Sequence, residues 1–407
     1  MTSLTINFVV SSVHEAGTYF RYHNFAQGLQ KSGHRVTVFG YDAMGEFPTS
    51  HEETRDGVSY RITKRVKGDN FFGKWNNPMA AVARSMQDYP KADVTHFFQP
   101  HLTSALPALM KHKNKSSLFL YDWDDLWAGE GLMKFVKNNS FKNWWQNKTL
   151  AYLEKVLPGK VHHVTACSHY LADLAKQRKA PGATVIHNGF WPYEVLSKEQ
   201  ARKNLKLDPD AKYIGFMGRT VWELAWCFKA LRQGVKKYEN LRLAICGPTM
   251  SELEMKGLDE ELKSKVDYLG QLPPLKTRDF AAAIDIGLLP LGDHEFNKSR
   301  FPIKYAEYMA ANANVLCSNV GECGLLAQEM PWVVEAGNGI DDWFVAFEQM
   351  LDALYSGTLP PVDRSHILEL FSWNTLGKEL EQLYLRELGL AEQSVPLVKP
   401  SVSSVYH

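Results

Sequence analysis

Short apolar runs alternate with amphipathic stretches along almost the whole chain, and this alternation starts twice. The first series opens with an apolar run at residues 5–12, a helical pattern at 19–31 and a second apolar run at 35–39. A polar interval at 190–212 has no strand pattern, and the alternation resumes at 213–217. Strands that alternate with helices indicate parallel sheets covered by helices on both faces. The sequence therefore predicts an α/β protein with two doubly wound, Rossmann-like domains and ligands at the carboxyl ends of the strands.

The composition narrows the class of protein without naming a function. The chain has 407 residues, which suffice for two domains, with 45% apolar and 22% charged residues, as in soluble globular proteins. A formal net charge of +1 gives no indication of nucleic-acid binding. The N-terminal apolar run lacks a basic segment before it and is interpreted as a first strand, not a signal peptide. Five cysteines without a CxxC pair favour reduced thiols in a cytoplasmic protein over disulfides or zinc.

One stretch, SRFPIKYAEYMAANANVLCS, contains a complete helix signal. Ser299 can cap the helix or stand just ahead of the cap, Pro302 suits the first turn, and Asn312 is expected to end the helix. Lys304 and Glu307 then share one face near the helix N-terminus. A cation, free N–H groups and a carboxylate suit a ligand with phosphate at one end and hydroxyls at the other. A surface helix with an ordinary Lys–Glu pair remains an equal alternative.

Polar residues also follow the predicted strands of the first half. Gly17 lies in the first crossover, where backbone N–H groups can meet a phosphate, although a plain turn is the favoured interpretation from these residues alone. Asp122 and Asp124 follow a strand and could orient or deprotonate an acceptor hydroxyl, cap a following helix, or bind a divalent cation, the last being the weakest interpretation. His14 and His101 have similar but weaker claims to the acceptor side.

Residues 131–157 mix lysines with aromatic side chains. This pattern predicts either a helix on an anionic membrane surface or a partly solvated helix whose Trp residues pack on the first domain, and the second interpretation is slightly favoured.

Several segments, taken in order, resemble the retaining glycosyltransferases of GT-B fold that are grouped as family 4. They include DAKYIGFMGR at 210–219, P-x-K-x-x-E-Y-M-A after Arg300, F-S-W at 371–373, and HVTACSHYLADL with VIHNG in the first half. The resemblance implies two Rossmann-like domains that face each other across a cleft, with a C-terminal helix that crosses back. The expected parts are an acceptor-side domain at 1–192, a linker at 193–212, a nucleotide-sugar domain at 213–370, the returning helix at 371–390 and a tail at 391–407.

The resemblance also implies an activity. Such enzymes move a sugar from a nucleoside-diphosphate donor to a hydroxyl acceptor with retention of configuration and without a metal or other cofactor. The acceptor is a glycan, a lipid-linked sugar or a small molecule. The residues implied as catalytic are Arg219, Lys304, Asp122 and Asp124. Those implied on the donor side are Gly17, Arg219, Ser299, Arg300, Phe301, Pro302, Ile303, Lys304 and Glu307, and those on the acceptor side are His14, His101, Asp122 and Asp124.

Two positions depart from the family pattern. Ser299 stands where the family has a glutamate, and Leu224 stands where it has a basic residue. Lys304 could supply the missing positive charge, with Lys298 and Arg300 as further candidates. The missing glutamate supports one alternative, a non-catalytic sugar-nucleotide-binding partner in a glycan assembly complex. A further alternative is another GT-B enzyme, such as a sugar-nucleotide epimerase, which shares the fold but not the P-x-K-x-x-E-Y-M-A segment or the F-S-W ending.

Overall fold

The computed structural model describes residues 2–112, 115–136, 140–218, 221–247, 258–337 and 339–390. The chain forms two compact units. Unit 1 consists of Met1–Asn188, His294–Phe301 and Trp373–His407, and unit 2 consists of Gly189–Asp293 and Pro302–Ser372. The short stretch His294–Phe301 therefore differs from the sequence-based boundaries, which place it in the second domain. The predicted tail at 391–407 lies outside the described residues.

Unit 1 contains an eight-stranded sheet in the order β3-β4-β2-β1-β5-β6-β7-β8. Its strands are β1 (Thr5–Val9), β2 (Arg35–Tyr41), β3 (His51–Arg55), β4 (Val58–Thr63), β5 (Ala92–Phe98), β6 (Ser116–Trp123), β7 (His163–Ala166) and β8 (Ala183–Val185). Its helices are α1 (Thr18–Lys31), α2 (Asp69–Phe72), α3 (Pro78–Ser85), α4 (Leu102–Pro107), α5 (Phe141–Val156), α6 (His169–Gln177), α12 (Glu295–Ser299) and α17 (Trp373–Glu387), with short helical turns at Ala108–His112, Leu132–Phe135 and Pro158–Lys160.

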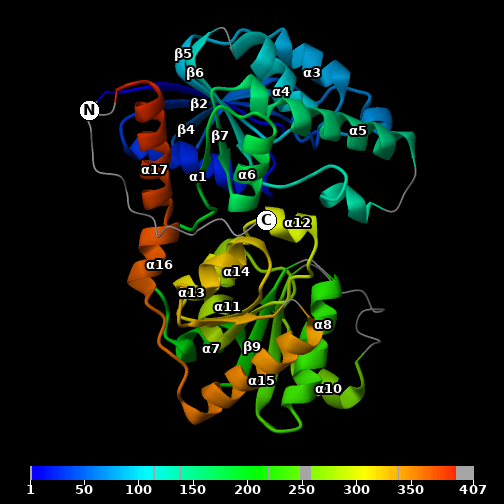
Figure 1. Ribbon diagram of the computed structural model, residues 1–407, viewed down its shortest axis with the longest axis vertical. Coiled ribbons are helices and arrows are strands. Elements are labelled where there is room, and N and C mark those ends of the chain that lie inside the picture. Colours follow the sequence, from blue (N-terminus) through cyan, green and yellow to red (C-terminus); the bar gives the residue numbers. More distant parts are fainter. Residues whose placement is uncertain are drawn as a thin grey trace. The chain divides into compact units, whose positions relative to one another are not determined.

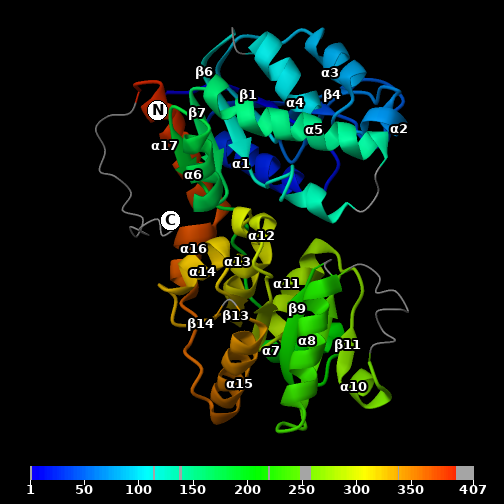
Figure 2. The same ribbon diagram turned by 45° about the vertical axis from the view of Figure 1, so that its right-hand side comes forward.

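The middle of this sheet is parallel and apolar. β1 pairs with β2 on one side and β5 on the other, both in parallel register. Figures 1 and 2 show α3, α4 and α5 together on one side of the sheet, with α1 on the other. The carboxyl ends of β1 and β5 therefore meet at the point where the strand order reverses, which is where ligands bind in doubly wound sheets.

The edge formed by β3 was missed from the sequence. β3 pairs with β4 in antiparallel register through a turn at Asp56 and Gly57, both with positive φ. Its sequence, HEETR, has no buried residue and therefore no apolar signal.

The last helix, α17, belongs to unit 1 because it packs against α1. A Cβ atom placed on Gly28 would lie 3.3 Å from the Cα atom of Gly377, so the two helix backbones are in close contact. Phe25 and Trp373 add an edge-to-face ring contact with centroids 5.2 Å apart. The returning helix implied by the family resemblance is thus present.

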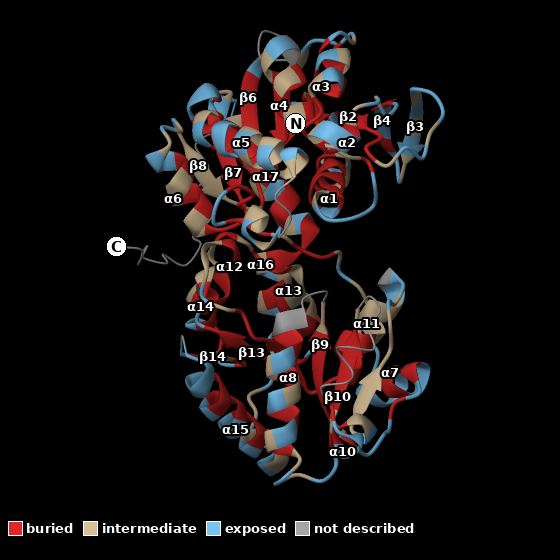
Figure 3. Cartoon of the chain, turned by 90° about the vertical axis from the view of Figure 1, so that its right-hand side faces the viewer, coloured by how far each residue is buried: buried red, intermediate tan, exposed pale blue. Residues whose placement is uncertain are grey.

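Unit 2 contains a six-stranded sheet in the order β11-β10-β9-β12-β13-β14, and every pairing in it is parallel. In Figure 3, β9 and β13 are coloured almost entirely as buried. Its strands are β9 (Lys212–Met217), β10 (Leu241–Cys246), β11 (Val266–Tyr268), β12 (Ile286–Leu289), β13 (Asn314–Ser318) and β14 (Val333–Ala336). Its helices are α7 (Lys198–Leu205), α8 (Val221–Gly234), α10 (Glu260–Ser264), α11 (Pro274–Ala283), α13 (Ile303–Ala310), α14 (Gly321–Ala327), α15 (Ile340–Ser356) and α16 (Arg364–Phe371).

The helix predicted to begin at Ser299 begins later. Ser299 is the last residue of α12, and α13 begins at Ile303 with Pro302 in the N-cap position. The Ser299 hydroxyl donates to the carbonyl of Phe296 and accepts from the N–H of Leu126, so it is not free to cap α13. The N-cap prediction is therefore wrong. The predicted end is confirmed, because Asn312 has φ of 66° just beyond the helix.

None of the helices in the described part of the chain combines the length and the apolar character that a membrane crossing requires.

Candidate functional site

Two glycine turns meet at the carboxyl ends of β9 and β10 in unit 2. The N–H of Gly218 donates to the carbonyl of Cys246 at 3.0 Å. A Cβ atom on Gly247 would lie 2.1 Å from the carbonyl oxygen of Gly218, so only glycine fits there without a shift of backbone. These turns leave the strand ends without bulky side chains.

Lys304 reaches this glycine corner from the first turn of α13. Its Nζ atom would lie 2.9 Å from a Cβ atom placed on Gly218. The same Nζ lies 3.3 Å from Oε2 of Glu223 and 4.6 Å from the centroid of the Phe216 ring. The Glu223 side chain is fully buried and that of Lys304 is 12% exposed. The buried carboxylate thus fixes an ammonium group beside the strand ends.

The contact between Glu223 and Lys304 explains how position 224 can hold a leucine where the family has a basic residue. Leu224 is 5% exposed and belongs to the apolar core of unit 2, which includes Leu231 and Trp343. A basic side chain would be buried there without a counterion. The neighbouring residue on α8, Glu223, instead points to Lys304, so the positive charge at this corner comes from α13.

Glu307 lies one turn after Lys304 on the same helix and stays partly exposed. Burial raises the pKa of its carboxyl group to about 7, while the positive charges of Arg278 and Lys304 oppose this rise. The Arg278 guanidinium also lies 4.5 Å from the centroid of the Tyr193 ring. α13 therefore presents a cation and a carboxyl group on one face, as the sequence predicts. Arg219 lies outside the described residues.

In unit 1 the acceptor-side candidates, together with the donor-side candidate Gly17, lie at the carboxyl ends of β1, β5 and β6. Gly17 has φ of 60° and precedes α1, with no atom within 4 Å of the position of its missing Cβ. The hydroxyl of Thr18 donates to Oδ2 of Asp124 at 2.6 Å. Oδ1 of Asp124 is buried and has no hydrogen-bond partner among the residues that the structure describes. Burial, and then the charge of Asp122, raise the pKa of Asp124 to about 6.

Asp122 has a different environment. Its two carboxylate oxygens accept from Nε and Nη2 of Arg21 at 2.8 and 2.9 Å, and Oδ2 also accepts from Thr165. Arg21 in turn donates to the carbonyl of His187 and to Oδ1 of Asn188. The predicted catalytic role does not fit a carboxylate that is fully buried in this ion pair. The same pairing occupies both oxygens of Asp122, one of the two carboxylates that a D-x-D metal site would use. The residues directly after the aspartates, 125–131, form no helix for either of them to cap.

The two candidate histidines, His101 and His14, also have different environments. His101 is buried, its Nδ1 lies 2.9 Å from the hydroxyl of Ser11, and its ring contacts those of Trp75 and Trp127. Burial lowers its pKa to about 3, so it is neutral near pH 7. His14 is half-exposed and lies 2.8 Å from Glu46.

Residues 299–301 belong to unit 1, although the sequence assigns them to the donor side together with Pro302 and Ile303. Ser299 is buried, and its carbonyl accepts from the hydroxyl of Ser168 at 2.6 Å. The carbonyl of Phe301 accepts from Asn188 at 3.2 Å. Arg300 lies near Asp125, where its positive charge opposes a burial that raises the Asp125 pKa to about 8.

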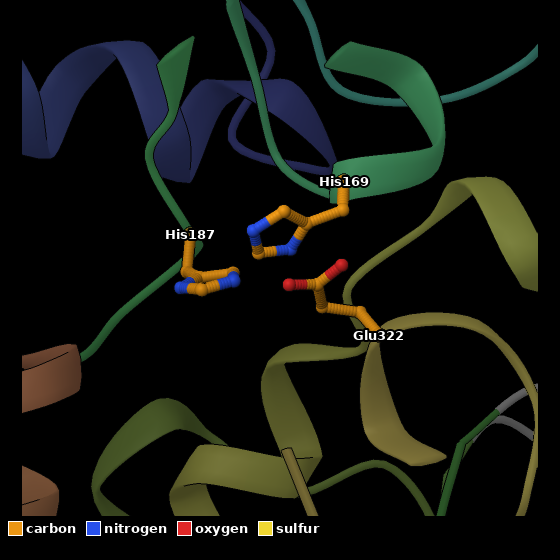
Figure 4. Close-up of side chains that lie close together, drawn as sticks. All are labelled: His169, His187 and Glu322. Atoms are coloured by element: carbon orange, nitrogen blue, oxygen red, sulfur yellow. The ribbon is translucent and has the colours of Figure 1, made fainter. Parts of the chain in front are cut away.

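Two further histidines of unit 1 lie close together. His169 begins α6 and His187 follows β8, and their ring centroids are 6.4 Å apart. Figure 4 shows the two rings pointing toward one another; Glu322, also labelled there, belongs to α14 of unit 2. Two imidazoles alone do not make a metal centre.

Two family models match successive parts of the chain. Residues 20–190 match the model described as Glycosyltransferase Family 4, and residues 211–353 match the model described as Glycosyl transferases group 1. Together they span most of both units. The chain belongs to the GT-B glycosyltransferases. This confirms the family and the fold that the sequence motifs suggest.

Individual relatives of this GT-B glycosyltransferase are distant. TuaH of Bacillus subtilis (strain 168), described as a glycosyltransferase of teichuronic acid biosynthesis, is 21% identical over 266 residues. This match covers 64% of the chain and 65% of TuaH. Sucrose-phosphate synthase from Thermosynechococcus elongatus has a TM-score of 0.70 at 16% identity, covering 96% of this chain and all of that one. Anabaena HepE, solved with UDP, has a TM-score of 0.64 at 14% identity, with 93% and 99% covered. At these identities the structures show the fold alone.

Three residues of this glycosyltransferase were missed from its sequence: Arg21, Glu154 and Glu223. Each is a buried charge on a helix. Arg21 binds Asp122 at the end of β6, Glu154 binds the loop after β6, and Glu223 binds Lys304 of α13. Glu154 of α5 accepts from the N–H groups of Trp127 and Ala128 at 2.7 and 3.4 Å, which holds the loop after Asp124. A single charge between apolar helical neighbours is the signal that could have found Arg21 and Glu223.

Proposed function

We propose that this protein transfers a sugar from a nucleoside-diphosphate sugar to a hydroxyl acceptor. The observation that supports this most is the Lys304 ammonium, fixed by Glu223 beside the glycine turns at the end of β9. A charged group that is already in position stabilises a leaving diphosphate without reorganising. HepE, which shares the fold, was solved with UDP and with UDP-glucose, and we extend this donor class to the present chain.

On the donor side, α13 supplies two kinds of contact. The first-turn N–H groups at Ile303 and Lys304, with the Lys304 ammonium, would bind the diphosphate. Glu307, one turn later, would accept hydrogen bonds from hydroxyl groups of the donor. Its pKa of about 7 leaves it partly ionised near neutral pH. Arg219, whose position follows Gly218 in the sequence, is retained as a second phosphate contact in this proposal.

On the acceptor side we assign Asp124. Its buried Oδ1, which has no hydrogen-bond partner among the described residues, would accept from the hydroxyl that attacks the donor sugar, and Thr18 holds the other oxygen. With a pKa of about 6 it is mostly ionised at pH 7 and can orient that hydroxyl. The leaving phosphate would take the proton in a front-face displacement that retains configuration. Because Lys304 supplies positive charge, we propose that transfer needs no metal ion.

The finer assignments are part of the same proposal. The donor sugar is a hexose, and the acceptor is a glycan, a lipid-linked sugar or a small molecule. We place the protein in the cytoplasm, where thiols stay reduced, because its five cysteines are buried and form no disulfide: Cys167, Cys227, Cys246, Cys317 and Cys323.

A panel of nucleoside-diphosphate sugars tests the activity. We expect slow release of the nucleoside diphosphate from one donor, faster release with acceptor, unchanged rates in EDTA, and a product with the donor's anomeric configuration by NMR. Inverted product would refute retention, and loss of turnover in EDTA would refute metal independence. Tight donor binding without turnover would instead support a non-catalytic partner, the alternative that the replacement of a carboxylate by the buried Ser299 favours. Interconversion of the sugar would support an epimerase.

The substitution Glu307→Gln tests the donor assignment. It keeps the size of the side chain but removes its charge, and we expect donor affinity to fall about 10-fold, the value of one hydrogen bond to a charged group. The matched control is Glu348→Gln on α15, where Glu348 bonds to Gln233. Equal donor affinity in the Glu307→Gln variant and the wild type would refute the assigned role.

A further inference from the structure

One outer surface of unit 1 exposes aromatic and apolar side chains where a helix normally presents polar ones. On α5, the exposed stripe is Phe141, Trp144, Lys148, Tyr152 and Lys155, spaced three or four residues apart. This spacing places all five on one helix face. The opposite face is buried in unit 1 through Leu150, Leu153 and Glu154.

The neighbouring helices extend this surface. Phe72 of α2 makes ring contacts with Phe141 and with Trp145, at centroid distances of 6.3 and 5.3 Å. Phe71 is exposed beside it. The exposed face of α3 is likewise apolar, consisting of Met79, Val82 and, at its C-terminal end, Met86. Figure 3 shows exposed residues on α2, α3 and α5. We call residues 66–87 and 140–157 the aromatic face.

The structure separates the two neighbouring tryptophans of α5. Trp145 packs inward, and its Nε1 donates to the carbonyl of Asn76 at 2.9 Å. Trp144 remains 55% exposed. Packing on the domain, the interpretation slightly favoured from the sequence, therefore describes Trp145 but leaves Trp144 and Phe141 facing outward.

The exposed charged side chains of the aromatic face are all positive. Both of its segments are fully described, and the only carboxylates in them, Asp69 and Glu154, are 5% and 2% exposed. Its lysines are Lys67, Lys74, Lys142, Lys148 and Lys155. A protein surface of this composition, with exposed Trp, Tyr and Phe alongside lysines and no exposed carboxylate, favours the interface of an anionic bilayer.

We propose that the aromatic face docks the protein on an anionic lipid bilayer. The rings would enter the headgroup region, and the lysines would stay at the level of the lipid phosphates. This refines the predicted contact at 131–157, because Lys134 pairs with Glu130 at 2.5 Å, Lys137 lies outside the described residues, and α2 and α3 are included. The proposal does not depend on the assigned reaction, since it concerns binding without donor or acceptor.

The test is sedimentation of the full chain with vesicles of phosphatidylcholine alone or mixed with phosphatidylglycerol. We expect binding to the anionic vesicles that weakens as salt is added, and little binding to the neutral ones. Replacing Lys148 and Lys155 by Gln should weaken partitioning about fivefold for each lysine. Phe141→Ser with Trp144→Ser should also weaken it. The matched control is Val345→Ser on α15 of unit 2, which is also 55% exposed and should bind like the wild type.

Three results would overturn the proposal. The first is absence of wild-type binding to anionic vesicles. The second is equal binding by the lysine variant and the wild type. The third is self-association in sedimentation velocity that the Phe141→Ser, Trp144→Ser variant abolishes, without vesicle binding, since the face would then bind a second copy. Circular dichroism and the melting temperature of each variant show that it is folded, because the substituted side chains are exposed and should leave both unchanged.

Discussion

Glu154 gives a stability prediction whose size follows from its environment. Its carboxyl group is 2% exposed and holds the loop after Asp124 through the N–H groups of Trp127 and Ala128. Burial is the main cause that raises its pKa from 4.5 to about 7. Between about pH 4.5 and 7 the unfolded chain has lost this proton while the folded protein keeps it, so the free energy of unfolding falls as pH rises. The full loss is about 3 kcal/mol.

The substitution Glu154→Gln removes this loss. At about pH 5 the variant should be about 1 kcal/mol less stable than the wild type, because one hydrogen bond is weakened. At about pH 8 it should be about 2 kcal/mol more stable, because the wild type then carries a buried charge that the variant lacks. Urea unfolding at the two pH values, followed by Trp fluorescence, measures both differences. A wild-type advantage that stays constant or grows with pH would refute the reasoning.

Glu130→Gln is the matched control for this experiment. Glu130 belongs to the same loop region, is exposed and pairs with Lys134. Its substitution should change the stability by less than about 1 kcal/mol at both pH values.

Two further substitutions test buried charges in each unit. Arg21→Met should destabilise unit 1 by about 3–5 kcal/mol in urea unfolding, because Asp122 is left buried without its partner. Adding Asp122→Asn should recover part of this loss. A single variant as stable as the wild type would contradict the stabilising role of the ion pair. Leu224→Arg introduces the basic residue of the family pattern. It should lower the melting temperature of unit 2 without raising donor affinity, because position 224 lies in the apolar core. A stable variant with tighter donor binding would contradict this placement of Leu224.

The fold could be predicted because its signals are local. Apolar strands and amphipathic helices repeat twice, and this pattern alone indicates two parallel sheets. β3 was missed because HEETR at a sheet edge has no apolar residue to mark it. His294–Phe301 was assigned to the wrong unit because its partners, Leu126 and Ser168, are more than a hundred positions away in the sequence.

The candidate site also contains some residues that local sequence predicts and others that it does not. Lys304 and Glu307 could be found because both lie on one helix and their spacing is local. Glu223 could not, since it is 81 positions from Lys304, and the Arg21–Asp122 pair spans 101. Asp122 and Asp124 look equivalent in the sequence, and only the structure distinguishes them: Arg21 pairs with both oxygens of Asp122, whereas Oδ1 of Asp124 has no hydrogen-bond partner among the described residues.

The central claim is that the Lys304 ammonium binds the diphosphate of the donor. Calorimetric titration of UDP into the wild type and into the double variant Glu223→Gln, Lys304→Met tests it directly, because the double variant leaves neither charge buried alone. Lys276→Met is the control, since Lys276 pairs with Asp279 at 2.9 Å on α11 of the same unit. The account predicts affinity about 10- to 100-fold weaker in the double variant, from the loss of a charge-assisted hydrogen bond, and unchanged affinity in the control. UDP binding of equal strength in the double variant and the wild type would contradict it.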